Sequence, residues 1–402
     1  MFDFLKKIDL DKVVQPDLFA LKNTDKHLLP QVIDRWHKEV FYSHIDFKNT
    51  SETCEFLFFR SLVREDYELL ENDIASSVND SNCVFFSNYK TNLKGLNLDI
   101  VRLITQCREI VYLINEKDPL IRNGLYLRVV WYVYVLQKIS EMEFKVFVAF
   151  ADMQPIENLI VQMLHLLKPD VQTVTLQHGL YIDYSGYETV NEVNYKNHVA
   201  KHFLAWGIET KELINKYHKD SSIFICGKPS IAGLPSVSEF QTRNNAKTDI
   251  LIVTDQKIFQ AQNEELADIV AIVAEKLGLN VYIRFHPSNN KNIILNKHPN
   301  FKELKRINRR YIVIGHTSSL LYEAHTLGYS TFRIKSNVHH IQFPSNLEFE
   351  SCEELIFKIT NFNEPKLSDS VRYISFVGSA SVFEYRNALN TILSLAINSK
   401  DI

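Results

Sequence analysis

The sequence of 402 residues lacks an excess of either charge, a long apolar run and closely spaced cysteines. Lysine and arginine total 45 against 48 acidic residues, so the net charge of -3 provides no general attraction to nucleic acid. With 11 glycines, 11 prolines and 46% hydrophobic residues, the composition excludes collagen-like and disordered chains. A chain of this length is expected to form two or three globular domains.

The five cysteines show neither CxxC spacing nor short Cys/His pairs, which argues against a disulfide framework and a structural zinc site. The first residues, MFDFLKKIDLDKVV, mix acidic with apolar residues and do not resemble a secretory signal. The most apolar stretch, 125–136, contains Arg128 and is shorter than the roughly 20 residues that span a bilayer. We therefore expect a cytoplasmic protein, with peripheral association at the inner face of the cell membrane left open.

The second half of the chain alternates predicted strands and helices. Short apolar runs that end at polar residues predict strands, and longer segments with apolar residues at helical spacing predict helices. The predicted strands are 247–254, 280–285, 310–315 and 330–334, and the predicted helices are 263–277 and 318–327. This alternation is typical of a parallel α/β sheet that binds ligands at the carboxyl ends of its strands.

The first half repeats this pattern from residue 144 onward. Its predicted strands are 144–150, 171–176, 202–206 and 222–226, with helices at 155–167 and 209–217. Earlier in the chain, 81–87 and 109–114 are predicted as strands, and 18–44 and 125–139 as helices. A linker is expected at 231–246, which separates domain 1–230 from domain 247–380, and the helix within 381–402 is expected to return to the first domain.

A histidine follows one predicted strand of the first half, in the tripeptide Gln177, His178 and Gly179. Gly179 permits a tight turn, so the strand delivers the imidazole to the ligand-binding edge of the sheet. The ordinary histidine pKa near 6.5 suits a general base that deprotonates a sugar hydroxyl near neutral pH. Asp183 and Glu188, in the following loop, are alternative bases, and a histidine that only hydrogen-bonds the loop is the non-catalytic alternative.

In the second half, Arg284 and His286 end a predicted strand, and Pro287 stops it. Alternate residues of a strand share a face, so these two side chains point the same way and could bind a phosphate. The loop that carries Thr254 and Lys257 follows a neighbouring strand and can reach the same crevice. A salt bridge for the arginine and a turn-filling role for the histidine are the structural alternatives.

Small hydroxyl residues open the predicted helix at 318–327. His316, Thr317, Ser318 and Ser319 lead into it, and hydroxyls and backbone amides at the positive end of a helix bind phosphate. Glu323 lies one turn further along the same face, where its carboxylate could accept hydrogen bonds from a ribose. The alternative is an ordinary serine cap followed by a surface glutamate.

Together the motifs QHG, WGIETKELI, ICGKP, RFHP and HTSSLLYEA resemble a known pattern in their order and spacing. The chain is similar to the two-domain GT-B glycosyltransferases that build bacterial capsules, lipopolysaccharides and related surface polymers. It particularly resembles the group with HP and Ser-Ser motifs, which includes bacterial sialyltransferases, polysialyltransferases and the CDP-glycerol glycerophosphotransferases of teichoic acid synthesis. The resemblance extends over residues 144–335 and implies two Rossmann-like domains that face a central cleft.

On the donor side, the resemblance implies that His286 and Pro287 lie beside the nucleotide, that Ser318 and Ser319 bind its phosphate, and that Glu323 holds its ribose.

On the acceptor side, the resemblance matches His178 to a histidine that the teichoic acid enzymes offer as a candidate base, although Gln177 stands where those enzymes have tryptophan. The acidic motif that supplies the base of polysialyltransferases has no clear match here, which makes a sialic acid donor less favoured.

The predicted activity is inverting transfer of a sugar from a UDP- or CMP-linked donor to a growing bacterial surface glycan, such as a capsule, O-antigen or exopolysaccharide. The expected partners are the nucleotide sugar and a glycan or lipid-linked glycan acceptor. No cofactor and no metal are expected, because the DxD triplet at 9–11 lies far from any predicted strand end. The alternatives are a CDP-polyol phosphotransferase, a non-catalytic module that binds nucleotide sugar or glycan, and a sugar-nucleotide epimerase of the same fold.

Overall fold

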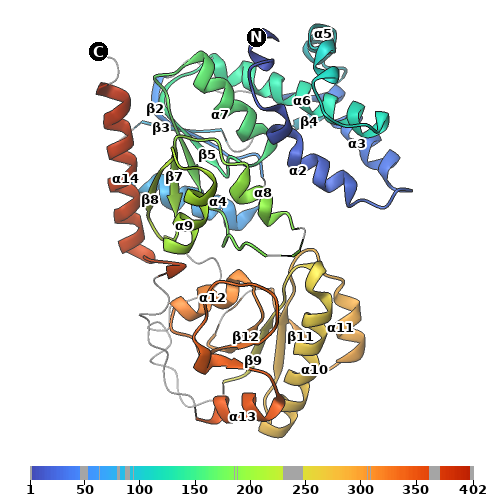
Figure 1. Cartoon of the computed structure of the whole chain (residues 1–402), viewed down its shortest axis with the longest axis vertical. Helices are drawn as coiled ribbons and strands as arrows, with labels where there is room; N and C mark the ends of the chain where they lie inside the picture. Colours follow the sequence, from blue (N-terminus) through green and yellow to red (C-terminus); the bar gives the residue numbers. More distant parts are fainter. Residues whose placement is uncertain are drawn as a thin grey trace.

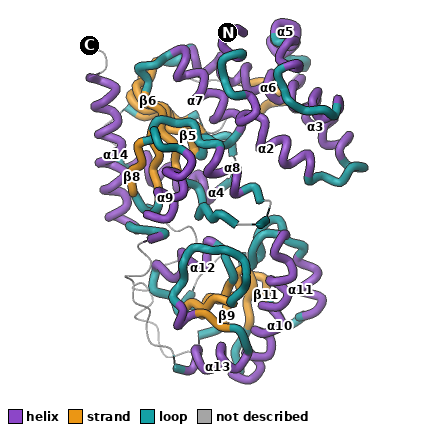
Figure 2. The backbone as a smooth tube through the Cα atoms, viewed as in Figure 1, coloured by secondary structure: helices purple, strands orange, loops and turns teal. Residues whose placement is uncertain are grey.

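Two parallel sheets of six strands each organise the chain, with helices packed around both. The computed structural model describes residues 2–45, 53–62, 64–78, 82–86, 91–93, 95–184, 186–187, 189–229, 248–305, 307, 309–361 and 372–398. Figure 1 shows two lobes, one above the other, and Figure 2 shows the strands at the centre of each lobe. We call the upper lobe, residues 2–229 with the last helix, the first domain, and residues 248–361 the second domain.

The sheet of the first domain is parallel throughout. Its strands, in spatial order, are β3 (Cys83–Phe85), β2 (Thr53–Phe59), β5 (Glu143–Phe150), β6 (Gln172–Leu176), β7 (His202–Ala205) and β8 (Ser222–Ile225). The central strands are nearly continuous apolar runs because helices cover both of their faces. The strand order changes direction between β2 and β5, which is where such sheets open a ligand crevice.

The helices of the first domain include a bundle on one side of the sheet. They are α1 (Phe2–Leu5), α2 (Leu10–Lys22), α3 (Leu29–Tyr42), α4 (Glu65–Ser76), α5 (Leu98–Gln106), α6 (Pro119–Ser140), α7 (Pro155–Leu167), α8 (Asn191–Lys196) and α9 (Ile208–Tyr217). The apolar run within α6 is buried on all sides, because α2, α3, α5 and α7 surround it. A short antiparallel pair, β1 (Ser43–Ile45) with β4 (Thr91–Leu93), lies beside this bundle. Among the described helices, none is long and apolar enough to cross a membrane.

The second domain has the strand order of a Rossmann fold. Its parallel strands, in spatial order, are β11 (Lys302–Glu303), β10 (Val281–Arg284), β9 (Ile250–Val253), β12 (Ile312–Gly315), β13 (Thr331–Ile334) and β14 (Glu348–Phe349). Numbered along the domain this order is 3-2-1-4-5-6, with its switch between β9 and β12. The helices are α10 (Gln260–Leu277), α11 (Lys291–Lys297), α12 (Ser319–Thr326) and α13 (Cys352–Thr360).

The last helix, α14 (Gly378–Asn398), packs against the first domain. Its buried residues lie over β5, β6 and α4, and the guanidinium of Arg386 donates to the carbonyl of Ser77 at 2.8 Å. The segment before it, 372–377, runs tightly along two turns of the first domain: the amide of Ser375 donates to the carbonyl of Trp206, and that of Lys228 to Phe376, each at 2.8 Å. This is how the chain returns from the second domain to the first.

The expectation of two Rossmann-like domains is confirmed, but the early part of the chain differs from the prediction. The strand predicted at 109–114 is wrong, because Arg108–Tyr112 forms a 3-10 helix in which Ile110 is buried and Tyr112 is exposed. Strand β2 and helix α4 were not predicted at all. The predicted linker at 231–246 lies outside the described residues.

The buried carboxyl of Glu157 in the first domain is expected to make the folding stability depend on pH. Glu157 accepts hydrogen bonds from the amide and hydroxyl of Ser61, at 2.7 and 2.8 Å, but burial raises its pKa from an ordinary 4.5 to about 8. Between these two values folding takes up a proton, so stability falls as the pH rises from 4.5 to 8, by roughly 1.4 kcal/mol for each unit.

We expect E157Q to keep both contacts with Ser61 and to flatten the dependence of the melting temperature on pH, with a more stable protein at pH 8. The exposed Glu143, replaced by glutamine, is the control and should leave the curve unchanged. Parallel curves for E157Q and the wild type would show that Glu157 does not titrate in this range.

Candidate functional site

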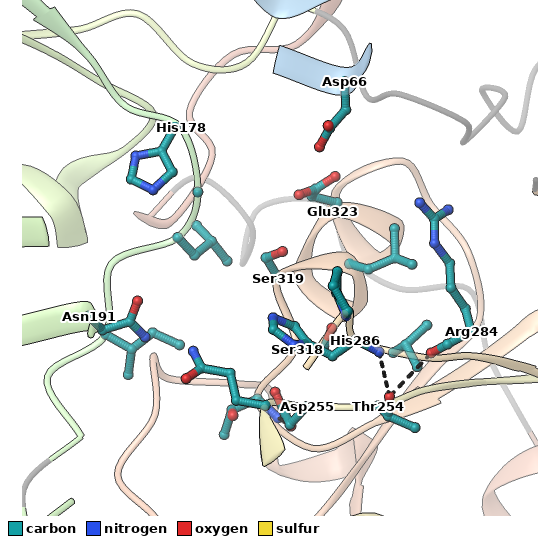
Figure 3. A pocket seen from close by; sticks show the side chains of 18 of the residues that line it. Asp66, His178, Asn191, Thr254, Asp255, Arg284, His286, Ser318, Ser319 and Glu323 are labelled. Atoms are coloured by element: carbon teal, nitrogen blue, oxygen red, sulfur yellow. Dashed lines mark hydrogen bonds between the residues drawn. The ribbon is translucent and has the colours of Figure 1, made fainter. Parts of the chain in front are cut away.

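A polar cleft lies between the two domains, at the carboxyl ends of the parallel strands from both sheets (Figure 3). Segments from both switch regions contribute to it. Its lining residues in the first domain are Arg64, Asp66, Tyr67, Leu70, His178, Gly179, Leu180, Ile182, Tyr184, Asn191, Asn194 and Lys228. Those in the second domain are Val253, Thr254, Asp255, Gln256, Arg284, Phe285, His286, Pro287, Thr317, Ser318, Ser319, Leu320 and Glu323. The cleft is therefore built from sequence segments that are far apart.

The second-domain wall contains the amino end of α12. Ser318 is the N-cap residue, but its side chain makes no capping hydrogen bond. Its hydroxyl and that of Ser319 line the cleft beside the positive end of the helix. This arrangement suits a phosphate oxygen.

A hydrogen-bond network fixes the turn that carries Arg284 and His286. The hydroxyl of Thr254 accepts from the backbone amide of His286 and from the side chain of Asn289, both at 2.8 Å, and donates to the carbonyl of Arg284 at 3.4 Å (Figure 3). The guanidinium of Arg284 has no ion-pair partner among the described residues and lines the cleft. Among the described residues it is thus an unpaired positive charge on the second-domain wall.

The imidazole of His286 is a neutral hydrogen-bond donor. Burial lowers its pKa, so the ring is neutral at pH 7 and carries one proton. Its Nδ1 accepts from the backbone amide of Ser288 at 3.2 Å, which leaves the proton on Nε2. A neutral donor on this wall can bind a phosphate oxygen without a change of charge.

Asp255 joins two loops of the second domain and does not act as a free carboxylate. Its side chain is buried, accepts from the amide of Thr317 at 2.7 Å and lies 3.3 Å from the ring of His316. Thr317 in turn accepts from the hydroxyl of Tyr184 at 3.2 Å, across the domain boundary. The bond from Tyr184 thus joins the first domain to the loop that Asp255 holds.

On the first-domain wall, buried Gln177 holds the turn that presents His178. Its side chain accepts from the amide of Trp206 at 2.6 Å, and donates to the carbonyl of Gly179 at 2.7 Å and to Thr210 at 2.9 Å. Gln177 is therefore a support for the turn rather than part of the lining.

The ring of His178 is neutral and partnered on one side. Its Nδ1 lies 3.1 Å from the hydroxyl of Tyr181, and the ring packs edge-on against Tyr67. Burial, reinforced by the positive charge of Arg64, lowers its pKa to about 4, and the charge of Asp66 opposes this shift. The imidazole therefore carries a single proton at neutral pH.

Arg64, Asp66 and Tyr67 form a second titratable group on the same wall, at the start of α4. The guanidinium of Arg64 donates to both carboxylate oxygens of Asp66, at 3.0 and 2.6 Å. It also donates to the hydroxyl of Tyr67 at 2.8 Å and lies 4.0 Å above that ring. Figure 3 shows the carboxylate of Asp66 pointing into the cleft.

An ion pair joins the two walls. The ammonium of Lys228, which lies over the ring of Trp206, contacts the carboxylate of Glu323 at 2.7 Å, and both side chains are largely buried. Glu323 is thus engaged across the domain boundary. A carboxylate has about four lone-pair sites, so it can also accept hydrogen bonds from a ribose.

The structure brings most of the predicted site residues together. The cleft is lined by His178, Gly179, Thr254, Arg284, His286, Pro287, Thr317, Ser318, Ser319 and Glu323.

The other predicted residues lie elsewhere. Lys257 is exposed beyond the cleft, and His316 is buried behind it. The carboxylate of Asp183 lies outside the lining and contacts Tyr195 and Lys216, at 3.2 and 3.3 Å. Glu188 lies outside the described residues.

Sequence reasoning missed Arg64, Asp66, Tyr67 and Lys228 as site residues. The signal for the first three was the buried run of β2 followed by the helical spacing of α4, which would have placed them at another strand end.

No protein-family model matches the chain, and no curated protein matches its sequence. Solved structures do match. The UDP-GlcNAc 2-epimerase from Neisseria meningitidis, bound to UDP-GlcNAc, has a TM-score of 0.51 at 9% identity, and covers 85% of this chain and 99% of that one. The UDP-GlcNAc 2-epimerase from Methanocaldococcus jannaschii has a TM-score of 0.51 at 12% identity, with 84% and 99% covered. The complex of S. aureus MnaA with UDP has a TM-score of 0.51 at 11% identity, with 85% and 96% covered.

These similarities, together with the two Rossmann-like sheets around one cleft, identify the fold as GT-B. At such identities the likeness is one of fold alone. Within the described parts of the chain, no group of three or more His, Cys, Asp or Glu side chains is placed to hold a metal ion.

Proposed function

We propose that the chain is an inverting glycosyltransferase that moves a sugar from a nucleotide-sugar donor, UDP- or CMP-linked, to a hydroxyl of a growing bacterial surface glycan. The observation that carries this proposal is the opposition of two different walls. One wall has a helix end, a free guanidinium and a neutral imidazole donor, and the other has a carboxylate and an imidazole. Glycosyl transfer needs an anion-binding surface opposite a proton-accepting one.

The second domain would hold the donor. The hydroxyls of Ser318 and Ser319, the amides of α12 and the side chains of Arg284 and His286 would bind its phosphates. As the bond between the anomeric carbon and the phosphate oxygen breaks, negative charge grows on the leaving phosphate. Fixed donors stabilise such charge most strongly in a cleft that excludes water. Glu323 would hold the ribose.

The first domain would present the acceptor, either a glycan or a lipid-linked glycan. Its hydroxyl must attack the anomeric carbon from the face opposite the leaving phosphate, which inverts the configuration. His178 and Asp66 are an imidazole and a carboxylate on this wall that line the cleft without pairing to the second domain. A base among them would take the proton of the attacking hydroxyl.

A thermal-shift screen against CMP, CDP, UDP, GDP and their sugar conjugates tests the donor site, because a ligand that binds only the folded state raises the melting temperature. We expect nucleotides of one nucleobase to raise the melting temperature most, and E323Q to reduce this increase. Glu303, an exposed glutamate of the same domain, is the matched control as E303Q. A chain that no nucleotide stabilises would contradict the proposal.

Product analysis with the selected donor then tests the reaction. Transfer to an added glycan with release of the free nucleotide supports the proposal. Conversion of the sugar nucleotide without any acceptor would indicate an epimerase, and transfer of a phosphate-linked unit from a CDP donor would indicate a polyol phosphotransferase. Binding without any turnover would indicate a non-catalytic module.

A further inference from the structure

The first-domain wall of the cleft supports a further inference about the general base, which rests on the proposed function. We propose that Asp66 is the general base of the cleft, and that Tyr181 fixes His178 as a hydrogen-bond donor at Nε2. Asp66 and His178 then have different roles. These roles follow from which atoms of the two side chains carry a proton.

The first step is the hydrogen bond between Tyr181 and His178. The phenol of Tyr181 is buried, and the same buried environment raises its pKa well above the ordinary value, so its hydroxyl keeps its proton. A buried hydroxyl proton requires an acceptor. Among the described residues, the one acceptor within reach of this hydroxyl is Nδ1 of His178, at 3.1 Å.

The hydrogen bond from Tyr181 determines which nitrogen of the neutral His178 ring carries the proton. Because Nδ1 of His178 is the acceptor within reach, the hydroxyl of Tyr181 donates its proton in a hydrogen bond to Nδ1. A neutral ring whose Nδ1 accepts a hydrogen bond must carry its proton on Nε2. Nε2 is then a donor and has no lone pair with which to accept the proton of an acceptor hydroxyl.

The carboxylates that line the cleft differ in how accessible they are to an incoming acceptor. Asp255 is buried and accepts the amide of Thr317, and the side chain of Glu323, paired with Lys228, is only 8% exposed. Asp66 has a side chain that is 42% exposed, and Figure 3 shows its carboxylate directed into the cleft. It is thus the lining carboxylate that an incoming acceptor can reach.

The fourth step concerns the orientation of Asp66. Arg64 donates one hydrogen bond to each oxygen, which leaves a lone pair on each for another partner. Arg64 is itself held by the hydroxyl and ring of Tyr67, so the carboxylate is fixed before a substrate binds. Tyr67, which accepts from Arg64, also packs against the ring of His178, so the base and the donor lie on the same wall of the cleft.

The proposed reaction moves one proton to Asp66 and one sugar to the acceptor. The carboxylate of Asp66 takes the proton of the acceptor hydroxyl while the acceptor oxygen bonds to the anomeric carbon. The bond from that carbon to the phosphate oxygen breaks, and its electron pair leaves with the nucleotide. Nε2 of His178 donates a hydrogen bond to the acceptor or the sugar, and Asp66 later releases its proton to water.

The test compares D66N with H178Q in donor turnover. Because glutamine keeps an N–H donor but is no base, H178Q should stay within roughly tenfold of the wild type, whereas D66N should lose at least roughly 100-fold in kcat. Formate should partly restore D66G. Glu68, an exposed acid of the same helix, is the matched control as E68Q. Both catalytic variants should keep the nucleotide-induced thermal shift, which shows that they fold and bind donor.

A D66N protein within tenfold of the wild type, or an H178Q protein as inactive as D66N, would overturn the assignment of the base. If no variant and no wild-type protein binds a nucleotide, the proposed function fails instead. A substrate-free measurement decides the role of Tyr181: NMR of histidine-labelled protein, with the signal assigned by its loss in H178Q. We expect the Nε2-protonated tautomer, and a mixture of tautomers in Y181F; an Nδ1-protonated ring in the wild type would overturn the proposal.

Discussion

Replacing Arg284 with glutamine is expected to weaken binding of the nucleotide that the thermal-shift screen selects by roughly 10- to 100-fold, the range of one or two charge-assisted hydrogen bonds. Arg284 lines the same cleft as the amino end of α12 and has no ion-pair partner among the described residues. Its loss therefore removes a binding charge without exposing an unpaired acid. Isothermal titration calorimetry of the folded variant measures this effect directly.

The matched control for R284Q is K257Q, which removes a cation from a neighbouring loop outside the lining. Because exposed charges at a distance are screened by salt, we expect its affinity to change by no more than about twofold. R284K should fall between the wild type and R284Q, since lysine keeps the charge but loses the planar fork. Equal affinities for R284Q and K257Q would place the phosphates elsewhere.

The second large effect concerns the segment that returns to the first domain. Gly227 has a φ of +76°, and a Cβ at this position would lie 2.1 Å from the carbonyl oxygen of Phe376. G227A must therefore adopt a left-handed backbone and displace segment 372–377. We expect a loss of about 3 kcal/mol or more in the free energy of unfolding, measured by urea denaturation.

The variant G378A separates the cost of the left-handed backbone from the cost of displacing segment 372–377. It has a φ of +57°, but a Cβ there would meet nothing within 4 Å. G378A should therefore lose only the left-handed penalty, about 1 to 2 kcal/mol. If G227A is no less stable than G378A, the close approach of Phe376 does not contribute, and the return segment adapts at little cost.

The sequence was most informative where strands and helices alternate without interruption. The sequence predicts the strands β5, β6, β9, β10 and β12 because they are short, mostly apolar runs that end in glycine, proline or polar residues, and all but β10 are buried on both faces over most of their length. The same pattern placed the ends of these strands at one edge of each sheet. Most donor-side candidates therefore lie in the cleft.

The remaining site residues depend on contacts that no local pattern contains. Lys228 pairs with Glu323 nearly a hundred positions later, and only the packing of the two domains brings them together. His316 and Lys257 belong to loops that reach the cleft, but burial turns one side chain inward and the other faces solvent. The tautomer of His178 depends on Tyr181, whose burial is not visible in the sequence.

The position of α14 also affects the order in which the domains form during synthesis. The helix covers β5, β6 and α4, yet it follows the entire second domain in the chain. A ribosome releases the chain from its N-terminus at roughly 5–20 residues per second, so residues 2–229 emerge while this cover is still missing. The second domain is continuous in sequence and can close its own sheet before then. The first domain is therefore the last to be completed, because its cover, α14, is made only after residues 248–361.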